Sequence, residues 1–235
     1  MKSFNRIRCL NKAVSEIIDE YNLIDVVVAD IGTDHGYLSE LLSRNKKIKK
    51  VFATDISQKC LDKTNQLISK CNIEKIETKL GDGLDAVDVV DLAVVAGIGG
   101  YEIINILQNQ NKINEKRKCD LFVLQPSDNT VELRQWINKN NMLVVSDFIF
   151  ESAKRFYSII VVDVSKTEVK KLDDFDLYFG RDNTLENKEF VNYLLYLKES
   201  LSYLDGLSKE RIDADEVLIQ KTKLKILIDK LLDKC

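Results

Sequence analysis

Two hydrophobic patterns alternate along the chain. Near the N-terminus, apolar residues recur at steps of three and four, at Ile7, Leu10, Val14, Ile17 and Tyr21. This spacing puts one apolar stripe on a helix and predicts a helix over residues 4–21. Farther along, short continuous apolar runs rich in β-branched residues are typical of strands buried on both faces of a sheet. The alternation of the two patterns indicates an α/β fold.

Seven apolar runs have the length and composition of strands. They predict strands over residues 26–31, 51–55, 76–80, 91–96, 120–124, 143–150 and 156–164. Helical segments separate the first five, which favours a Rossmann-like, doubly wound seven-stranded sheet with an antiparallel pair at one edge. Pro126, the only proline, is expected to end the fifth strand. Asp128 or Asn129 is expected to cap the next helix.

The pattern changes after about residue 165. Residues 172–181 are expected to form an irregular acidic connection. Two periodic apolar runs then predict an antiparallel helical hairpin with a coiled-coil-like seam, at Phe190, Leu194, Leu197, Leu201, Leu204, Val217, Leu224, Ile228 and Leu231. We therefore divide the chain into a sheet domain, 1–164, and a linker with a helical hairpin, 165–235. This second part carries 13 basic and 15 acidic side chains, so its charges nearly cancel. The hairpin is therefore as well suited to packing or dimerisation as to docking of a substrate.

Composition narrows the class of protein. The chain has 235 residues, of which 45% are hydrophobic, and a net charge of −3. It has no apolar run of about 18 residues and no apolar signal core after Met1, which predicts a cytoplasmic protein without a membrane span. Five cysteines, never spaced as Cys-x-x-Cys, favour reduced thiols over disulfides or a zinc site, so no metal is expected. We expect a monomer or a weak homodimer.

The first predicted strand ends in a glycine-containing loop. Its glycines do not have the spacing of the dinucleotide fingerprint, and no Gly-Lys-Ser/Thr of a phosphate-binding loop follows a strand. The loop matches the acidic-x-Gly-x-Gly-x-Gly pattern of methyltransferases that use S-adenosylmethionine at three of four positions, with Asp34 in place of the middle glycine. The carboxyl ends of strands form the ligand crevice of such sheets. We therefore assign Asp30, Gly32, Thr33 and Gly36 to cofactor binding.

The next two strand ends carry acids with a candidate role toward the same cofactor. Asp55, followed by Ile56, can accept both hydroxyls of a ribose, although an aspartate at this position can also cap a helix. Asp82 and Gly83 form a turn by default. In a methyltransferase sheet, Asp82 would lie within reach of the adenine amino group of the cofactor.

The fourth strand ends in a segment that a simple turn does not explain. Ala96 is followed by three glycines in four residues, at Gly97, Gly99 and Gly100. Glycine costs backbone entropy, so this density predicts a close approach of the backbone to a ligand. We also assign Gly83 and Ala96 to cofactor binding.

The N-terminal helix carries Arg6, Arg8 and Lys12 with no acid among its first twelve residues. A solvated helix face is the simpler interpretation. The alternative is a local patch that contacts the phosphates of RNA.

A family resemblance rests on five motifs together, Ala29–Leu38, Ala53–Ile56, Gly81–Leu84, Ala96–Gly100 and Leu124–Pro126. With them the chain resembles the bacterial tRNA adenine-N1 methyltransferases that modify adenine 22. The resemblance implies S-adenosylmethionine as cofactor, tRNA as substrate and a C-terminal coiled-coil hairpin. Two mild departures, Gly36 where alanine is also familiar and Ile98 where methionine is common, alter no chemical group.

The chemistry of this reaction mainly demands positioning. Adenine N1 keeps its lone pair in the ring plane and attacks a methyl group without prior deprotonation. We assign Asp34 and His35, as the nearest polar groups, and the segment Gly97, Ile98, Gly99 and Gly100 to the catalytic site. A methyltransferase of this fold acting on a protein or a small molecule is the alternative, and a non-catalytic binding module is a weaker one.

Overall fold

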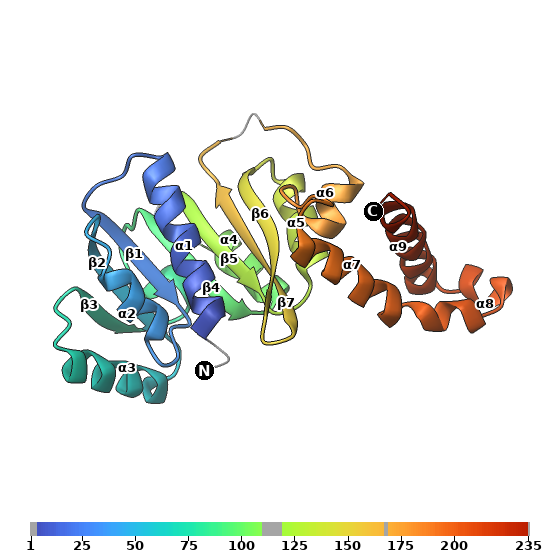
Figure 1. Ribbon diagram of the computed structural model, residues 1–235. Coiled ribbons are helices and arrows are strands. Elements are labelled where there is room, and N and C mark those ends of the chain that lie inside the picture. Colours follow the sequence, from blue (N-terminus) through green and yellow to red (C-terminus); the bar gives the residue numbers. More distant parts are fainter. Residues whose placement is uncertain (1–3, 110–118, 167–168, 235) are drawn as a thin grey trace.

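A seven-stranded mixed sheet forms the centre of the molecule (Figure 1). The computed structural model describes residues 4–109, 119–166 and 169–234. The strands have the order β3-β2-β1-β4-β5-β7-β6. The first five pair in parallel, and β7 pairs antiparallel with both β5 and β6. Their bounds are β1 Val26–Ile31, β2 Ile48–Asp55, β3 Ile76–Leu80, β4 Leu92–Ile98, β5 Leu121–Pro126, β6 Leu143–Ser152 and β7 Arg155–Asp163. The predicted doubly wound sheet is confirmed.

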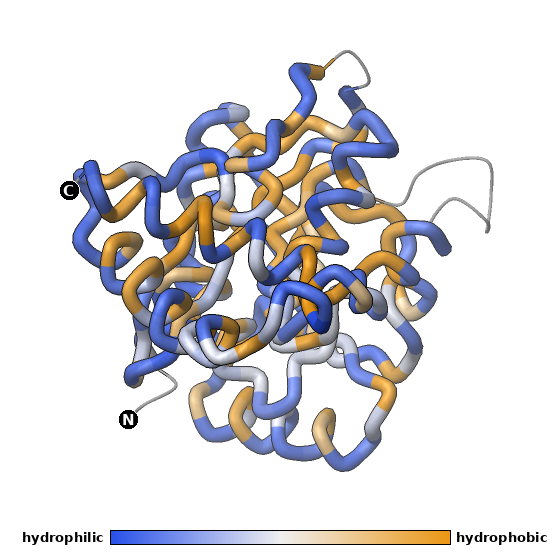
Figure 2. Tube along the Cα trace, turned by 90° about the vertical axis from the view of Figure 1, so that its right-hand side faces the viewer, coloured by the Kyte–Doolittle hydropathy of each residue, from blue (hydrophilic) through white to orange (hydrophobic). Residues whose placement is uncertain are grey.

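Helices cover both faces of this sheet. Helix α1 Phe4–Glu20 precedes the first strand, and the elements between the strands are α2 Tyr37–Ser43, α3 Gln58–Cys71, η1 Gly83–Ala86, α4 Gly100–Asn109 and α5 Thr130–Lys139. Helices α1 and α2 share one apolar cluster with one face of the sheet, whereas α4 and α5 share a second cluster with the other. Orange and blue segments alternate along the outer helices in Figure 2, as expected for helices with one buried face.

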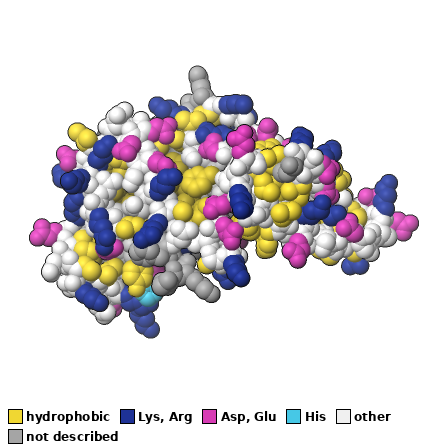
Figure 3. All heavy atoms as spheres, viewed as in Figure 1, with side chains coloured by type: hydrophobic (Ala, Val, Ile, Leu, Met, Phe, Trp, Pro, Cys, Tyr) yellow, Lys and Arg dark blue, Asp and Glu magenta, His cyan; other side chains and the backbone are white. Residues whose placement is uncertain are grey.

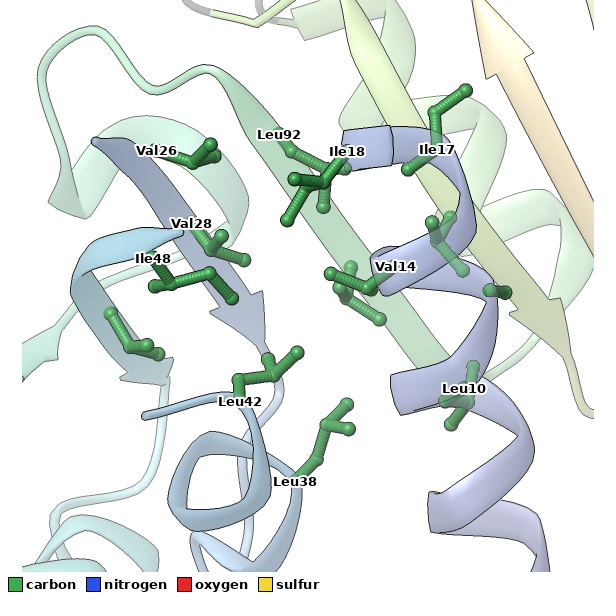
Figure 4. Close-up of a cluster of buried hydrophobic side chains, with 14 of the residues drawn as sticks. Leu10, Val14, Ile17, Ile18, Val26, Val28, Leu38, Leu42, Ile48 and Leu92 are labelled. Atoms are coloured by element: carbon green, nitrogen blue, oxygen red, sulfur yellow. The ribbon is translucent and has the colours of Figure 1, made fainter. Parts of the chain in front are cut away.

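The apolar stripe of α1 forms part of the first of these clusters. Leu10, Val14, Ile17 and Ile18 are at most 2% exposed and face strand residues such as Leu92 (Figure 4). The predicted helix therefore packs along the sheet and brings its first turns to the carboxyl ends of the parallel strands (Figure 1).

One expectation about β5 and the turn after it is confirmed, and one is wrong. Pro126 is the last residue of β5, as expected, and pairs with Ile98 of β4. Its missing N–H costs nothing there, because the pairing of β5 with β7 already ends at Leu124. Asn129 precedes α5 in a left-handed conformation without a side-chain cap, and a carboxylate oxygen of Asp128 lies 3.4 Å from the Gly100 N–H instead.

The C-terminal part is more helical than expected. Its elements are α6 Asp174–Phe179, α7 Lys188–Ser200, η2 Ser202–Gly206, α8 Lys209–Asp213 and α9 Glu216–Leu232. The expectation of an irregular connection is wrong at α6, where Asp173 and Asp176 form a capping box. Helices α7 and α9 pack together as a hairpin, although Val217 of the predicted seam is 56% exposed.

Candidate active site

The loop after β1 is built over a buried carboxylate. Asp30 is 3% exposed and accepts hydrogen bonds from the hydroxyls of Thr33, at 2.8 Å, and Ser39, at 2.6 Å. Burial raises the pKa of the Asp30 carboxyl, and these two hydrogen bonds oppose the rise. Asp30 and Thr33 line neither of the two cavities described below, so their contacts support the loop from beneath.

The two glycines of this loop are required by its conformation and by its neighbours. Gly32 and Gly36 both have a φ of +73°, which disfavours any residue with a side chain. A Cβ at Gly36 would also lie 2.6 Å from Cγ2 of Thr64. The loop thus packs tightly against α3, and its shape is set by the protein.

A cavity of about 370 Å³ opens at the carboxyl ends of β1, β2 and β3. It brings together five of the residues that the sequence assigns to cofactor binding, Gly32, Asp55, Ile56, Asp82 and Gly83. Gly36 and Ala96 do not line it. We call it the cofactor cavity.

One wall of the cofactor cavity was not predicted. It comes from α4, which contributes Glu102, Asn105 and Asn109. These polar residues recur at steps of three and four, so one helical face with polar groups beside a glycine-rich strand end is the signal that could have revealed them.

The groups that line the cofactor cavity fit S-adenosylmethionine, whose sulfonium and ammonium groups are cations. Four carboxylates line it, from Asp55, Asp82, Asp85 and Glu102, and no lysine or arginine among the described residues does so. The hydroxyl of Thr54, which also lines the cavity, is buried without a hydrogen-bond partner. A buried hydroxyl at a cavity wall is able to bond a ligand or a water there.

Asp34 and His35 lie outside both cavities. Their side chains are 61% and 44% exposed, with 3.5 Å between Asp34 Oδ2 and His35 Nε2, and the histidine is visible at the surface in Figure 3. The Asp34 N–H donates to Asp55 Oδ2 at 3.1 Å. The loop therefore ties to the ribose-binding candidate through its backbone.

The glycine-rich segment after β4 has close neighbours within the protein. A Cβ at Gly97 would lie 2.9 Å from a guanidinium nitrogen of Arg6, and one at Gly100 would lie 2.5 Å from the Asn129 carbonyl oxygen. Gly99 packs between side chains of α4 and the turn before α5. Close packing thus accounts for much of the glycine density that the sequence attributes to a ligand.

Gly97 and Ile98 separate two cavities. Ile98 lines the cofactor cavity, whereas Gly97 lines a second cavity of about 730 Å³. Arg6 also lines the second cavity and donates to Gln125 Oε1 at 2.6 Å. Arg6 is thus held beside the site. Arg8 and Lys12, the two other basic residues singled out on α1, are exposed and line neither cavity, and Lys12 pairs with Glu16 at 3.4 Å.

In the described part of the chain, no group of three histidine, cysteine, aspartate or glutamate side chains is placed to hold a metal ion. None of the helices described is both long and apolar enough to cross a membrane.

Known proteins resemble the chain in sequence and in fold. A model of the tRNA (adenine(22)-N(1))-methyltransferase family matches residues 28–233. The Bacillus subtilis tRNA (adenine(22)-N(1))-methyltransferase is 25% identical over 222 residues, 92% of each chain.

Two crystal structures of a Streptococcus pneumoniae protein, described as a candidate tRNA (m1A22) methyltransferase, have a similar fold. The first has a TM-score of 0.77 and 26% identity, and covers 92% of this chain and 97% of that one. The second, a complex with S-adenosyl-L-methionine, has a TM-score of 0.79 and 24% identity, and covers 97% of this chain and 98% of that one.

Proposed function

The chain belongs to the tRNA (adenine(22)-N(1))-methyltransferase family, and on that premise we propose how its residues carry out methyl transfer from S-adenosylmethionine to N1 of adenine 22 in tRNA. The observation that carries the proposal is the pairing of an acidic cofactor cavity with a second cavity across Gly97 and Ile98. The first suits a cationic methyl donor. The second leaves room for the acceptor.

Residues of the cofactor cavity hold and orient the donor. The carboxylates of Asp55 and Asp82 accept hydrogen bonds from the ribose hydroxyls and the adenine amino group of the cofactor. Gly32 would let the backbone pass close to it, and Ile98, whose Cδ1 would lie 3.0 Å from a Cβ at Gly32, lines the cavity beside that glycine. Bound S-adenosylmethionine supplies an activated methyl group.

The acceptor needs orientation rather than deprotonation. The adenine N1 lone pair forms the new N–C bond as the C–S bond breaks, the sulfur keeps that electron pair, and the positive charge passes to the base. The protein must therefore hold the base in line with the methyl group and keep it unstacked from the tRNA. We assign Gly97 to the passage between donor and base.

A direct assay tests the activity. The enzyme is incubated with labelled S-adenosylmethionine and a tRNA transcript lacking modifications, followed by nucleoside analysis. Labelled 1-methyladenosine is expected, and a matched transcript with guanine at position 22 is expected to remain unlabelled. Label in protein, in a small molecule or nowhere would favour the alternative acceptors or a binding module.

A matched pair of variants tests the cofactor cavity. We expect Asp55→Asn to weaken binding of S-adenosylhomocysteine about tenfold or more, since a hydrogen bond to a charged group contributes roughly 1.5–3 kcal/mol. Asp88→Asn removes an exposed carboxylate outside the cavity and serves as the control. Equal affinities of both variants, measured by calorimetry, would remove Asp55 from the site.

The sequence assigns Asp34 and His35 to contacts with the substrate base, whereas both lie outside the two cavities, so this assignment has its own test. Under this proposal Asp34→Ala loses methylation and still binds S-adenosylhomocysteine. Unchanged turnover would remove the catalytic role, and lost cofactor affinity would make it a cofactor-binding residue. We further propose that the enzyme works in the cytoplasm. We also propose that it is a monomer or a weak homodimer, and sedimentation of the purified protein tests this oligomeric state.

A further inference from the structure

The second cavity has a shape that the sheet topology explains. The pairing of β5 with β7 ends at Leu124 and Ile160, while β6 and β7 stay paired as far as Ser152 and Arg155. The β6–β7 hairpin therefore extends past the end of β5. Its projecting residues form one wall of the cavity, beside Gly97 and the end of β5.

The tip of this hairpin is a two-residue turn. Ala153 and Lys154 connect the strands and have φ values of 53° and 62°. Two left-handed residues form the type of turn that fits a two-residue hairpin, but non-glycine residues there are strained. Arg155, the next residue, begins β7 and lines the cavity.

The lining of the second cavity is opposite in charge to that of the cofactor cavity. Arg6 and Arg155 line it, and no aspartate or glutamate of the described chain does. Three aromatic side chains complete it, from Phe156, Tyr157 and Tyr193. Cations beside aromatic rings are the combination that binds the phosphates and bases of unpaired nucleotides.

The C-terminal helices supply part of this cavity. Tyr193 belongs to α7 and lies 5.3 Å from Phe156 of β7, measured between ring centroids. The Tyr157 ring stacks on Phe150, with 5.5 Å between centroids. The aromatic walls are thus supported from both sides, by α7 and by β6.

Arg6 has a fixed place at the inner end. Its guanidinium lies against the bare Gly97 backbone and is held by Gln125, whose amide also donates to the Pro126 carbonyl oxygen at 2.7 Å. Gly97 thus lines the same cavity as Arg155 and is bonded to Ile98, a wall of the cofactor cavity.

We propose that the second cavity holds the target nucleotide of the tRNA after it has left its stack, with the base against Tyr157 and its phosphate on Arg155. Arg6 acts as a positioning residue that keeps Gln125 and Gly97 in place. The volume of about 730 Å³ lies in the range of about 300–1,000 Å³ usual for small-molecule sites. The inference rests on the proposed methyl transfer and adds the residues that receive the acceptor.

Matched variants test this assignment. Arg155→Gln and Tyr157→Leu are each expected to lower kcat/KM for tRNA about tenfold or more, because a stacked aromatic or a phosphate contact is lost. Tyr157→Phe, which keeps the ring, should restore most of the activity. Lys70→Gln removes an exposed charge on α3 and should change nothing. All variants should keep wild-type affinity for S-adenosylhomocysteine, which shows that they fold.

A fluorescent base gives a second readout. A tRNA with 2-aminopurine at position 22 should brighten or dim when the wild-type enzyme unstacks the base. Tyr157→Leu should change that bound-state signal, and Lys70→Gln should not. If wild-type enzyme forms 1-methyladenosine while Arg155→Gln and Tyr157→Leu match it in kcat/KM and signal, the cavity assignment is overturned and the proposed function stands. If the wild-type enzyme itself forms none, the proposed function fails.

Discussion

Asp30 and Asp147 are two of the buried carboxylates in the described part of the chain, and their hydrogen bonds come from different sources. Asp30, under the first glycine loop, receives its side-chain hydrogen bonds from two hydroxyls within nine residues of it. Asp147, on β6, is 0% exposed and forms a bidentate pair with Arg134 of α5, at 2.7 and 2.8 Å. The hydrogen-bond donors of the first carboxylate come from nearby in the sequence. The donor of the second comes from helix α5.

The difference corresponds to what each acid supports. Arg134 also donates to the carbonyl oxygens of Leu177 and Tyr178, at 3.4 and 3.2 Å, and the Asp147 N–H donates to Asp182 at 2.8 Å. The ion pair therefore joins the sheet to α6 and the residues after it. Asp30 instead fixes a short loop without any cation, which leaves the adjoining cavity acidic.

The largest effect on stability is expected from breaking the ion pair. Arg134→Met leaves the Asp147 carboxylate buried and unpaired, and we expect the free energy of unfolding to fall by about 3–5 kcal/mol. Urea unfolding measures it. The double variant Arg134→Met/Asp147→Leu should recover much of the loss, since two apolar groups replace the pair. A loss below about 1 kcal/mol for Arg134→Met would show that the joint is not held by this pair.

Two glycine variants compare the regions directly. Gly180→Ala would put a Cβ 2.6 Å from Asp147 Oδ1 at a φ of +88°, and Gly36→Ala would put one 2.6 Å from Thr64 Cγ2 at a φ of +73°. We expect each to cost about 1–3 kcal/mol. Only Gly36→Ala should weaken binding of S-adenosylhomocysteine. Equal cofactor affinities in calorimetry would mean that the loop shape matters little to the cavity.

A pH series tests Asp30. Its pKa is raised in the folded protein above the ordinary 3.8, so the stability linked to its protonated form is complete below about pH 4 and is lost as pH rises through the native pKa. Relative to Asp30→Asn, the wild-type protein should thus become less stable as pH rises from about 4. Parallel stability curves from urea unfolding at several pH values would contradict the burial argument.

The smallest effect on stability is expected at the exposed acid of the same loop. Asp34→Ala removes a side chain that is 61% exposed, at a left-handed φ of 50° that aspartate tolerates better than alanine, so the free energy of unfolding should fall by no more than about 1 kcal/mol. The same urea experiment measures it. A larger loss would mean that the weak contact of Cys60 with Asp34, 3.5 Å from Sγ to Oδ1, contributes more than its geometry indicates.

The same contrast explains what the sequence could predict. Asp30, Gly32 and Gly36 lie within one short segment, so spacing alone revealed the loop. The groups around Asp147 come from residues 134, 177–178 and 182–183, and no local pattern links them. The helix α6 was missed because a six-residue helix is too short to show a periodic apolar pattern.

The candidate site follows the same rule. Asp55, Ile56, Asp82 and Gly83 each follow a strand directly, and the carboxyl ends of parallel strands meet at one edge. Arg155 lines the second cavity because the β6–β7 hairpin extends past the end of β5. This length difference depends on strand register, which no short motif encodes. The charge of Arg6 predicts a contact to phosphate but not its location. Only the fold brings its guanidinium against the Gly97 backbone.

Tyr193 has a consequence for exchanging parts between related enzymes. Because this residue of α7 lines the same cavity as Gly97, the C-terminal helices are not an independent attachment. A chimera that carries the α7–α9 segment of a relative also receives that relative's wall residue. Its turnover should then follow the donor of the helices as well as the donor of the sheet.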